Sequence, residues 1–233
     1  GRSIWQRRWV LGEFVIRNLR IDLTQNTEGA WQLSGVATPD SNDPADLNAL
    51  YQTFLSFTEL ELQGVAINVH PLNGDSFSFV QGTASVRNQG QNHYLHVNAS
   101  LEGNPEPLTI SFELQGEDLN QASGTLHILV PDADYSQVFA GQDLGALAIL
   151  GLEGSGQVWI GVEAGQLSAA TVEFDVPGLT ISGKRREQAR QTESEQLGLT
   201  NLKGMARLSH NSEESVWELA LANMSVTYRS DSW

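Results

Sequence analysis

Phe14-Val-Ile-Arg-Asn-Leu-Arg-Ile-Asp-Leu23 is the stretch that decides the fold, because the chain uses its pattern four times. The other copies are Leu60 to Val69, Phe174 to Gly183 and Leu219 to Tyr228. Each copy reads apolar-x-apolar-x-(Asn or Gly)-apolar-x-apolar, and three of them add a further -x-apolar. Apolar residues that alternate within each half predict a β-strand with one buried face.

The alternation slips by one residue in the middle of each copy, at Asn18, Gly64, Gly178 and Asn223. Asn and Gly are the residue types that most easily adopt a left-handed backbone. One extra residue in a strand is a β-bulge, which returns the second half of the strand to the first half's face. The pattern therefore predicts long, bent strands with one continuous apolar face.

Composition allows a sizeable core, because the chain has 233 residues of which 40% are hydrophobic and 18% charged. The net charge of −15 argues against binding of nucleic acid and against broad docking on anionic lipid. Without cysteine, the chain has no disulfide and no thiolate metal site. No apolar run reaches the ~18 residues of a membrane span. The chain begins inside a repeated pattern, and we interpret it as a piece of a longer protein.

Two helices are expected among the strands. Asp43-Pro44 is a good helix start, and Leu47, Leu50, Tyr51, Phe54 and Leu55 form one apolar stripe, which predicts a helix over 43–56 that covers one end of the sheet. A shorter helical stretch is predicted from Pro131 to Ala140. Residues 184–196 are charged and predict a solvated loop. The short alternating segments between Phe77 and Val130 predict further hairpins.

The sequence carries no pattern of an active site, and we expect no enzymatic activity, cofactor or metal. His93 and His96 are three residues apart, so a strand puts them on opposite faces, and we expect both to be exposed. Asp132-Ala-Asp134 lacks the later Gly and Glu of a calcium loop, so helix capping is the better interpretation. None of the nucleophile, zinc or phosphate-loop motifs occurs.

Long strands with one apolar face leave two architectures open. In a closed β-sandwich, a second sheet covers the face, and a row of exposed tryptophans could bind carbohydrate. In the alternative, the sheet curls into an open groove whose apolar interior holds lipid, since large apolar patches without a function are rare. A structural spacer without ligand is a third possibility.

The run from Trp9 to Gly35 resembles the AsmA-like family, in particular its YhdP branch, and so do Gly154-Ser-Gly156-Gln-Val-Trp159 and the final Trp217-Glu-Leu-Ala-Leu-Ala-Asn-Met224. The resemblance implies a mainly β fold of long, bulged antiparallel strands curled into an open, taco-like groove with one or two short helices. It implies one elongated segment over 1–233 of a larger periplasmic protein of Gram-negative bacteria. That protein would be anchored in the inner membrane and would conduct phospholipid toward the outer membrane.

The groove lining expected from the four copies consists of their apolar residues, which would contact phospholipid acyl chains. These candidates are Phe14, Ile16, Leu19, Ile21, Leu23, Leu60, Leu62, Val65, Ile67, Val69, Phe174, Val176, Leu179, Ile181, Leu219, Leu221, Met224 and Val226.

Overall fold

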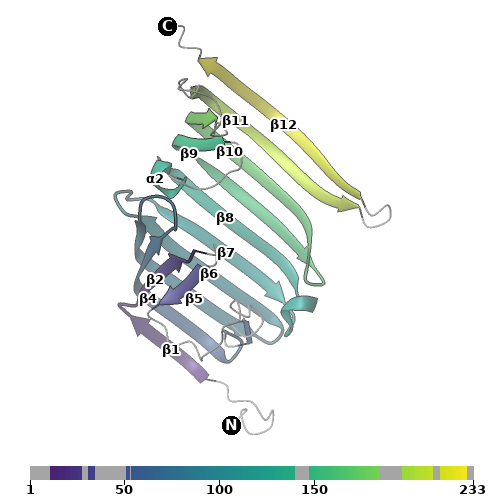
Figure 1. Cartoon of the computed structure of the whole chain (residues 1–233). Coiled ribbons are helices and arrows are strands. Elements are labelled where there is room, and N and C mark those ends of the chain that lie inside the picture. Colours follow the sequence, from purple (N-terminus) through teal and green to yellow (C-terminus); the bar gives the residue numbers. More distant parts are fainter. Residues whose placement is uncertain are drawn as a thin grey trace.

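The structure is a computed structural model that describes residues 11–27, 31–34, 51–52, 54–139, 147–183, 196–211 and 216–229. All the strands described belong to one twelve-stranded sheet (Figure 1). The sheet does not close on itself, because its path runs from β12 at one edge to β3 at the other. The protein is therefore mainly β and open, as the resemblance implies, and the described residues contain no second sheet that would make a sandwich.

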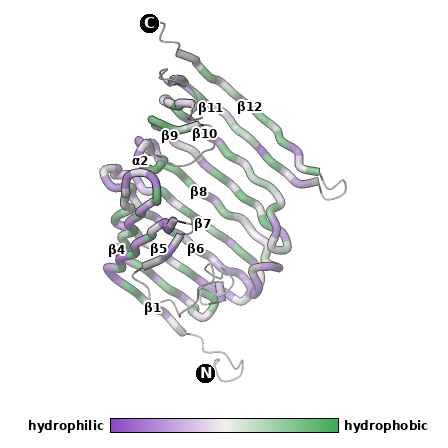
Figure 2. The backbone as a smooth tube through the Cα atoms, in the orientation of Figure 1, coloured by the Kyte–Doolittle hydropathy of each residue, from purple (hydrophilic) through white to green (hydrophobic). Residues whose placement is uncertain are grey.

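The strands differ in length, from four residues in β3 to eighteen in β10. Their bounds are β1 (Leu11–Arg17), β2 (Arg20–Gln25), β3 (Trp31–Ser34), β4 (Phe57–His70), β5 (Phe77–Gln89), β6 (Asn92–Leu101), β7 (Pro107–Gln115), β8 (Ser123–Asp134), β9 (Leu147–Glu163), β10 (Gln166–Gly183), β11 (Gln196–Asn211) and β12 (Val216–Arg229). Hydropathy alternates along most of them (Figure 2), which is the period expected of strands with two different faces.

From β4 to β12 the sheet is an antiparallel meander in which each strand pairs with the next. By contrast, β1 and β2 both pair with β4 in parallel, with Phe14 beside Leu60 and Ile21 beside Ile67. The first two copies of the pattern start 46 residues apart (60 − 14), and this spacing is the register of that parallel pair. Copies three and four lie on β10 and β12, which β11 separates.

A line of irregular residues crosses the strands where the apolar alternation slips, and we call it the kink line. Asn18 (φ 57°), Gly64 (φ 66°) and Asn223 (φ 53°) have the predicted left-handed backbone. Register shifts place bulges at Gly64 in β4 and at Asn223 in β12. Regular pairing of β2 with β4 resumes past the kink line, where the Ala66 N–H donates to the Leu19 carbonyl at 2.9 Å.

The third copy is irregular one position earlier than predicted, and Gly178 does not have a left-handed φ. Between the pairs Asp175–Ser155 and Gly178–Glu153, β10 has two residues, Val176 and Pro177, where β9 has one. Proline has no N–H to donate to a sheet ladder, so the irregularity forms at Pro177 and the glycine is not needed for it.

The predicted helix over 43–56 is confirmed only for its last turn, in which Tyr51, Gln52 and Phe54 are helical and the Leu55 N–H donates to the Tyr51 carbonyl. Residues 43–50, like the predicted loop residues 184–195, lie outside the described ranges. The predicted helical stretch from Pro131 is wrong at its start. Pro131 to Asp134 complete β8, and the helix α2 spans only Ser136–Phe139.

One cluster of buried side chains lies at a rim of the sheet. Tyr51 and Leu55 pack there on Leu114 and Ala122, whose side chains are almost fully buried, with Phe112 beside them. A globular protein of 25.4 kDa is expected to expose roughly 10,000 Å², whereas this chain exposes 16464 Å². The open, single-layer sheet formed by the described strands contributes to this excess.

Candidate functional site

Two rows of apolar side chains run across ten strands on one face of the sheet, which we call the apolar face. Residues that pair directly across neighbouring strands share a face. The first row is Phe14, Leu60, Val86, Leu95, Phe112, Leu126, Ile160, Ala170, Leu208 and Leu219. The second row is Ile16, Leu62, Ala84, Val97, Ile110, Ile128, Val158, Val172, Ala206 and Leu221.

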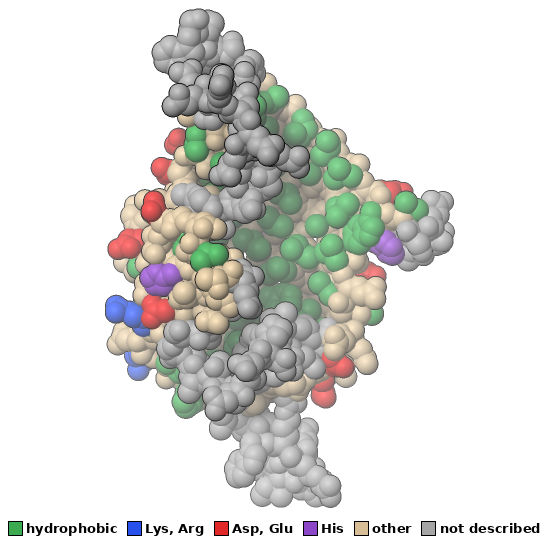
Figure 3. Space-filling view, viewed as in Figure 1, with side chains coloured by type: hydrophobic (Ala, Val, Ile, Leu, Met, Phe, Trp, Pro, Cys, Tyr) green, Lys and Arg blue, Asp and Glu red, His purple; other side chains and the backbone are tan. Residues whose placement is uncertain are grey.

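Neither row contains a polar residue, so the apolar surface is continuous along the sheet. Strands lie ~4.8 Å apart, which makes each row about 43 Å long. Figure 3 looks into a hollow where hydrophobic side chains gather, and the charged residues in view lie toward the outside. The apolar face is therefore the lining of a groove that runs across the strands.

The opposite face, which we call the polar face, carries polar and charged residues at the neighbouring positions. One of its rows runs through Val15, Glu61, Ser85, His96, Ser111, His127, Trp159, Thr171 and Arg207. This difference between the faces matters because it gives the sheet one side suited to water and one suited to hydrocarbon.

Seventeen of the eighteen residues predicted to line a groove lie in strands on the apolar face, and Leu19 lies between β1 and β2. Six of them belong to the two rows, namely Phe14, Ile16, Leu60, Leu62, Leu219 and Leu221. Phe174 and Val176 adjoin the kink line on β10. The others lie beyond the kink line, where Ile21, Ile67 and Phe79 are neighbours across three strands. The bulges achieve this, since they return the second half of each strand to the same face.

Sequence reasoning missed most of the two rows, because it took lining residues only from the four copies of the slipped pattern. Residues on β5 to β9, such as Val97, Ile110 and Ile128, alternate without a slip near the rows. Their alternation was a usable signal, and pairing them with the copies would have required the register.

Exposure of the rows changes strongly along the groove. Leu60 and Val86 expose only 5% and 6% of their surface, whereas Leu219 and Leu221 on β12 expose 65% and 60%. The apolar face is therefore covered at Leu60 and Val86 and open to solvent at β12.

A contact across β11 shapes the floor beside the kink line. A Cβ atom at Gly204 would lie 3.1 Å from Cζ of Phe174 and would collide with the Met224 sulfur. Glycine at this position thus lets the Phe174 ring from β10 and the Met224 side chain from β12 meet over β11, and both belong to the predicted lining.

Hydrogen bonds hold the last turn of the predicted helix to the rim. The Tyr51 hydroxyl donates to the Gly116 carbonyl at 2.6 Å, and burial raises the pKa of Tyr51. Its ring contacts His93 edge-on, with centroids 5.9 Å apart.

The expectation of an exposed His93 is wrong, because the helix covers it. His96 is exposed on the opposite face, as predicted.

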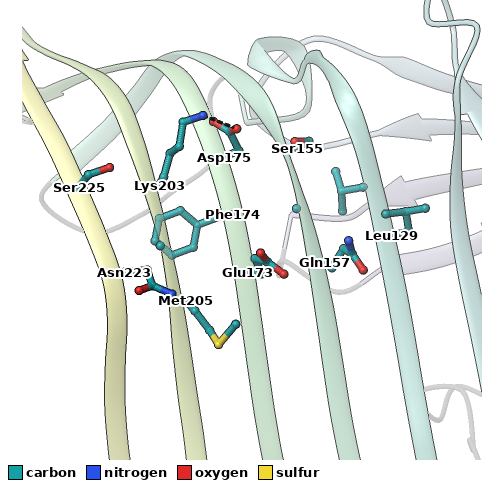
Figure 4. Close-up of a pocket in the computed structure, with 13 residues that line it drawn as sticks. Leu129, Ser155, Gln157, Glu173, Phe174, Asp175, Lys203, Met205, Asn223 and Ser225 are labelled. Atoms are coloured by element: carbon teal, nitrogen blue, oxygen red, sulfur yellow. Dashed lines mark hydrogen bonds and ion pairs between the residues drawn. The ribbon is translucent and has the colours of Figure 1, made fainter.

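The polar face carries an open depression of about 420 Å³ over β8 to β12 (Figure 4). Lys203 Nζ and Asp175 Oδ2 form an ion pair across it at 2.7 Å, and both side chains are half exposed. Over the ranges that the structure describes, no cluster of His, Cys, Asp or Glu could hold a metal ion.

The tryptophans with described exposure do not form a row. Trp159 lies on the polar face and stacks on His127, with ring centroids 5.2 Å apart. Trp217 lies on the apolar face beside His210. These two tryptophans therefore do not build a shared aromatic platform for carbohydrate.

Among the helical residues that are described, none belongs to a helix long and apolar enough to cross a membrane. Comparisons of the chain with protein-family models, with characterised proteins and with solved structures found no match.

Proposed function

We propose that the apolar face binds the acyl chains of phospholipids and shields them from water while they move along the groove. The observation that carries this proposal is the pair of unbroken apolar rows across ten strands, on a face that no other described sheet covers.

Hydrocarbon is the ligand that best matches such a surface. An acyl chain that leaves a bilayer exposes methylenes to water at about 0.8 kcal/mol each, so a chain of roughly sixteen carbons faces a cost on the order of 10 kcal/mol. The apolar face replaces that water contact with side-chain contact. The headgroup stays in solvent, where the groove is open.

The uniformity of the two rows supports a lipid that slides along the groove, in preference to a lipid bound at one fixed position. Aliphatic side chains make up nearly all of both rows, so no position holds a chain by a directional bond. One acyl chain extends over half of a ~30 Å hydrocarbon core, or about 15 Å. The rows are almost three times that length, which lets a lipid shift along them without leaving apolar contact.

We place this activity in a segment of a periplasmic protein that carries phospholipid between the inner and outer membranes. The resemblance of the repeated strands to the AsmA-like family supports that setting. The net charge of −15 fits a sheet whose outer face is in water and which does not bind an anionic membrane along its length. The parts of the longer protein outside this chain would contact the two membranes.

The proposal is tested by placing charge in the groove. Ile67 on β4 and Ile181 on β10 lie on the apolar face beyond the kink line, paired with Phe79 and Leu197 respectively. We expect Ile67→Asp/Ile181→Asp to lower the phospholipid that co-purifies with the protein at least several-fold, as measured by mass spectrometry after solvent extraction.

The matched control is Ala66→Asp/Thr180→Asp, which adds the same charges to the same strands on the polar face. This control should retain lipid. Equal lipid in both double variants, with the β-sheet circular dichroism intact, would contradict the proposal, and a wild-type protein without lipid would favour a structural spacer.

A further inference from the structure

The polar face carries aromatic side chains that contact with water alone does not explain. Trp159 exposes 37% of its surface there and stacks on His127, with ring centroids 5.2 Å apart. Tyr94 lies on the same face, on β6, two strands away from His127 on β8. Tryptophan is highly buried on average, so an indole left open on the water-facing side of a sheet requires a reason.

A second open depression of the polar face, of about 350 Å³, lies beside these rings over β4 to β8. Its lining includes Tyr94, Glu113, Thr125 and His127. A phenol, a carboxylate, a hydroxyl group and an imidazole together offer both donors and acceptors of hydrogen bonds. This lining suits a ligand that carries several hydroxyl groups.

The two depressions of the polar face meet at the stack of His127 and Trp159. His127 lines the depression over β4 to β8, and Gln157 lines the one over β8 to β12 (Figure 4). The two side chains are in contact, with His127 Nε2 3.3 Å from Gln157 Oε1. Trp159 is two residues from Gln157 on β9 and therefore shares its face. The depressions are thus adjoining sites with an aromatic stack at their junction.

One side of the Trp159 indole is available to a ligand. Its neighbours across the strands are His127 on β8 and Thr171 on β10. Because the imidazole stacks on one face of the indole, a ligand can stack only on the face toward β10, over the short side chain of Thr171. Arg207 follows on β11, where its guanidinium can donate hydrogen bonds to that ligand.

We propose that the polar face binds a neutral glycan chain, with one sugar ring stacked on Trp159 over Thr171 and its neighbours in the two depressions. The C–H groups of a sugar ring carry a small positive charge and meet the negative face of an aromatic ring. The sugar hydroxyl groups exchange hydrogen bonds with side chains such as Glu113. The net charge of −15 disfavours an acidic polysaccharide.

A glycan is favoured over an extended peptide, because the backbone of these strands is already paired. The ladders from β6 to β10 use the N–H and carbonyl groups between the strands. Extended peptides are recognised mainly through free backbone groups at a sheet edge. Over the middle of the sheet only side chains remain, and here they are groups that recognise hydroxyl groups and sugar rings.

The test is isothermal titration calorimetry of the full chain with hexa-N-acetylchitohexaose, which is a neutral glycan. The wild type should bind it saturably, with a Kd of about 1 mM or tighter. Trp159→Ala should weaken binding about fivefold, because the stacking surface is lost. Trp159→Phe retains an aromatic ring and should keep most of the affinity.

The matched control is Trp217→Ala. Trp217 is also an exposed tryptophan beside a histidine, but it lies on the apolar face, so this variant should bind the glycan like the wild type. Glu113→Ala changes a depression without touching the aromatic stack, and it should weaken binding about threefold through lost hydrogen bonds. It decides the matter if circular dichroism shows that Trp159→Ala does not fold.

Three results would each overturn the proposal. The first is a wild type that binds neither chitohexaose nor maltohexaose at about 10 mM. The second is wild-type affinity in folded Trp159→Ala or, where that variant does not fold, in Glu113→Ala. The third is an equal loss of affinity in Trp217→Ala, which would place the sugar on the other face.

These readouts do not depend on whether the groove binds phospholipid. The variant Ile67→Asp/Ile181→Asp should keep wild-type affinity for chitohexaose, since its changes lie on the apolar face. Hexaserine, a peptide rich in hydroxyl groups, should give no saturable binding. Binding of hexaserine that Trp159→Ala weakens would assign the site to a peptide and would contradict the glycan.

Discussion

Single residues on the kink line keep each strand's apolar residues on one face. Gly64 has a φ of 66°, and its Cα faces Asn18, which has a φ of 57°. A Cβ atom at Gly64 would lie 3.0 Å from the Asn18 side-chain oxygen. Glycine at this position thus serves two needs, a left-handed backbone and room for the neighbouring asparagine.

Gly64→Ala is expected to destabilise the protein by about 1–2 kcal/mol, because a left-handed backbone costs an L-residue that much and the new Cβ crowds Asn18. Urea unfolding measures the change. Gly198→Ala on β11 is the control, since a Cβ there meets nothing within 4 Å, and it should change stability by under 1 kcal/mol. Equal effects of the two substitutions would contradict this role of Gly64.

At the scale of residues, the sequence predicted kinks only where Asn or Gly stood at a slip in the alternation. Gln81 (φ 55°) and Asn201 (φ 53°) also have left-handed backbones inside strands. Glutamine is not enriched in that conformation. The apolar pattern around Asn201 is too short for a slip in its alternation to be recognised. Both lie next to kinked neighbours, so the pairing of whole strands imposes their conformation.

Side-chain hydrogen bonds terminate the strand β8. Pro131 and Asp132 form a bulge opposite β9, and the Tyr135 hydroxyl donates to the Pro131 carbonyl at 2.6 Å. The Asp134 carboxylate accepts the Ser136 N–H at 2.9 Å, and its hydrogen bonds with Ser136 lower the pKa of Asp134. These contacts end the strand and begin the short helix α2.

Tyr135→Phe should lower stability by about 1 kcal/mol at pH 7, through the lost hydrogen bond. Burial, with the negative charges of Asp132 and Glu106, raises the pKa of Tyr135 to about 12 from the ordinary 10.0. The hydroxyl's contribution is therefore complete below pH 10 and is lost as the pH rises toward 12.

Urea unfolding of the wild type and of this variant checks the prediction. The difference in unfolding free energy should shrink between about pH 10 and pH 12, and the ultraviolet titration should lose one phenol that ionises near pH 12. A difference that stays constant over this range would contradict it.

The sequence misplaced the start of this helix for a physical reason. Pro131-Asp-Ala-Asp-Tyr135 has the composition of a helix start. The same residues also fit a β-bulge at the end of a strand. Local composition favours both structures equally. The pairing of Ala133 with Gly154 decides between them, and that pairing joins residues that are distant in the sequence.

At the scale of the molecule, the described strands form a single open sheet with two unlike faces. The apolar rows face a hollow, and the polar face opposes them (Figure 3). Bound hydrocarbon would cover the apolar rows and should therefore stabilise the fold.

Protein freed of lipid should gain about 2.7 kcal/mol of stability at a ligand concentration of one hundred times Kd. For a chain of this size the gain corresponds to a rise in Tm of roughly 5–10 °C. Lysophosphatidylcholine, added below its micelle concentration and followed by calorimetry, provides the test. Glycerophosphocholine has the same headgroup without an acyl chain and should give no shift. Equal shifts from both compounds would point to headgroup binding.

The four slipped copies were enough to predict a mainly β protein with one apolar face and bulged strands. They could not decide between an open groove and a closed sandwich, because both need the same alternation. That decision depends on whether a second sheet covers Leu60, Val86 and Leu126, and their sequence context is compatible with either. The parallel placement of β1 and β2 beside β4 was present as a spacing of 46 residues, but its meaning required the register.

The meander from β4 to β12 gives each of these strands contacts almost solely with the strands beside it. Such an arrangement is close to one-dimensional, so stability is a sum of neighbouring interfaces and is not held in a shared centre. A substitution that weakens one interface is then expected to loosen mainly the two strands that share it, and distant strands of the meander should keep their protection from hydrogen exchange.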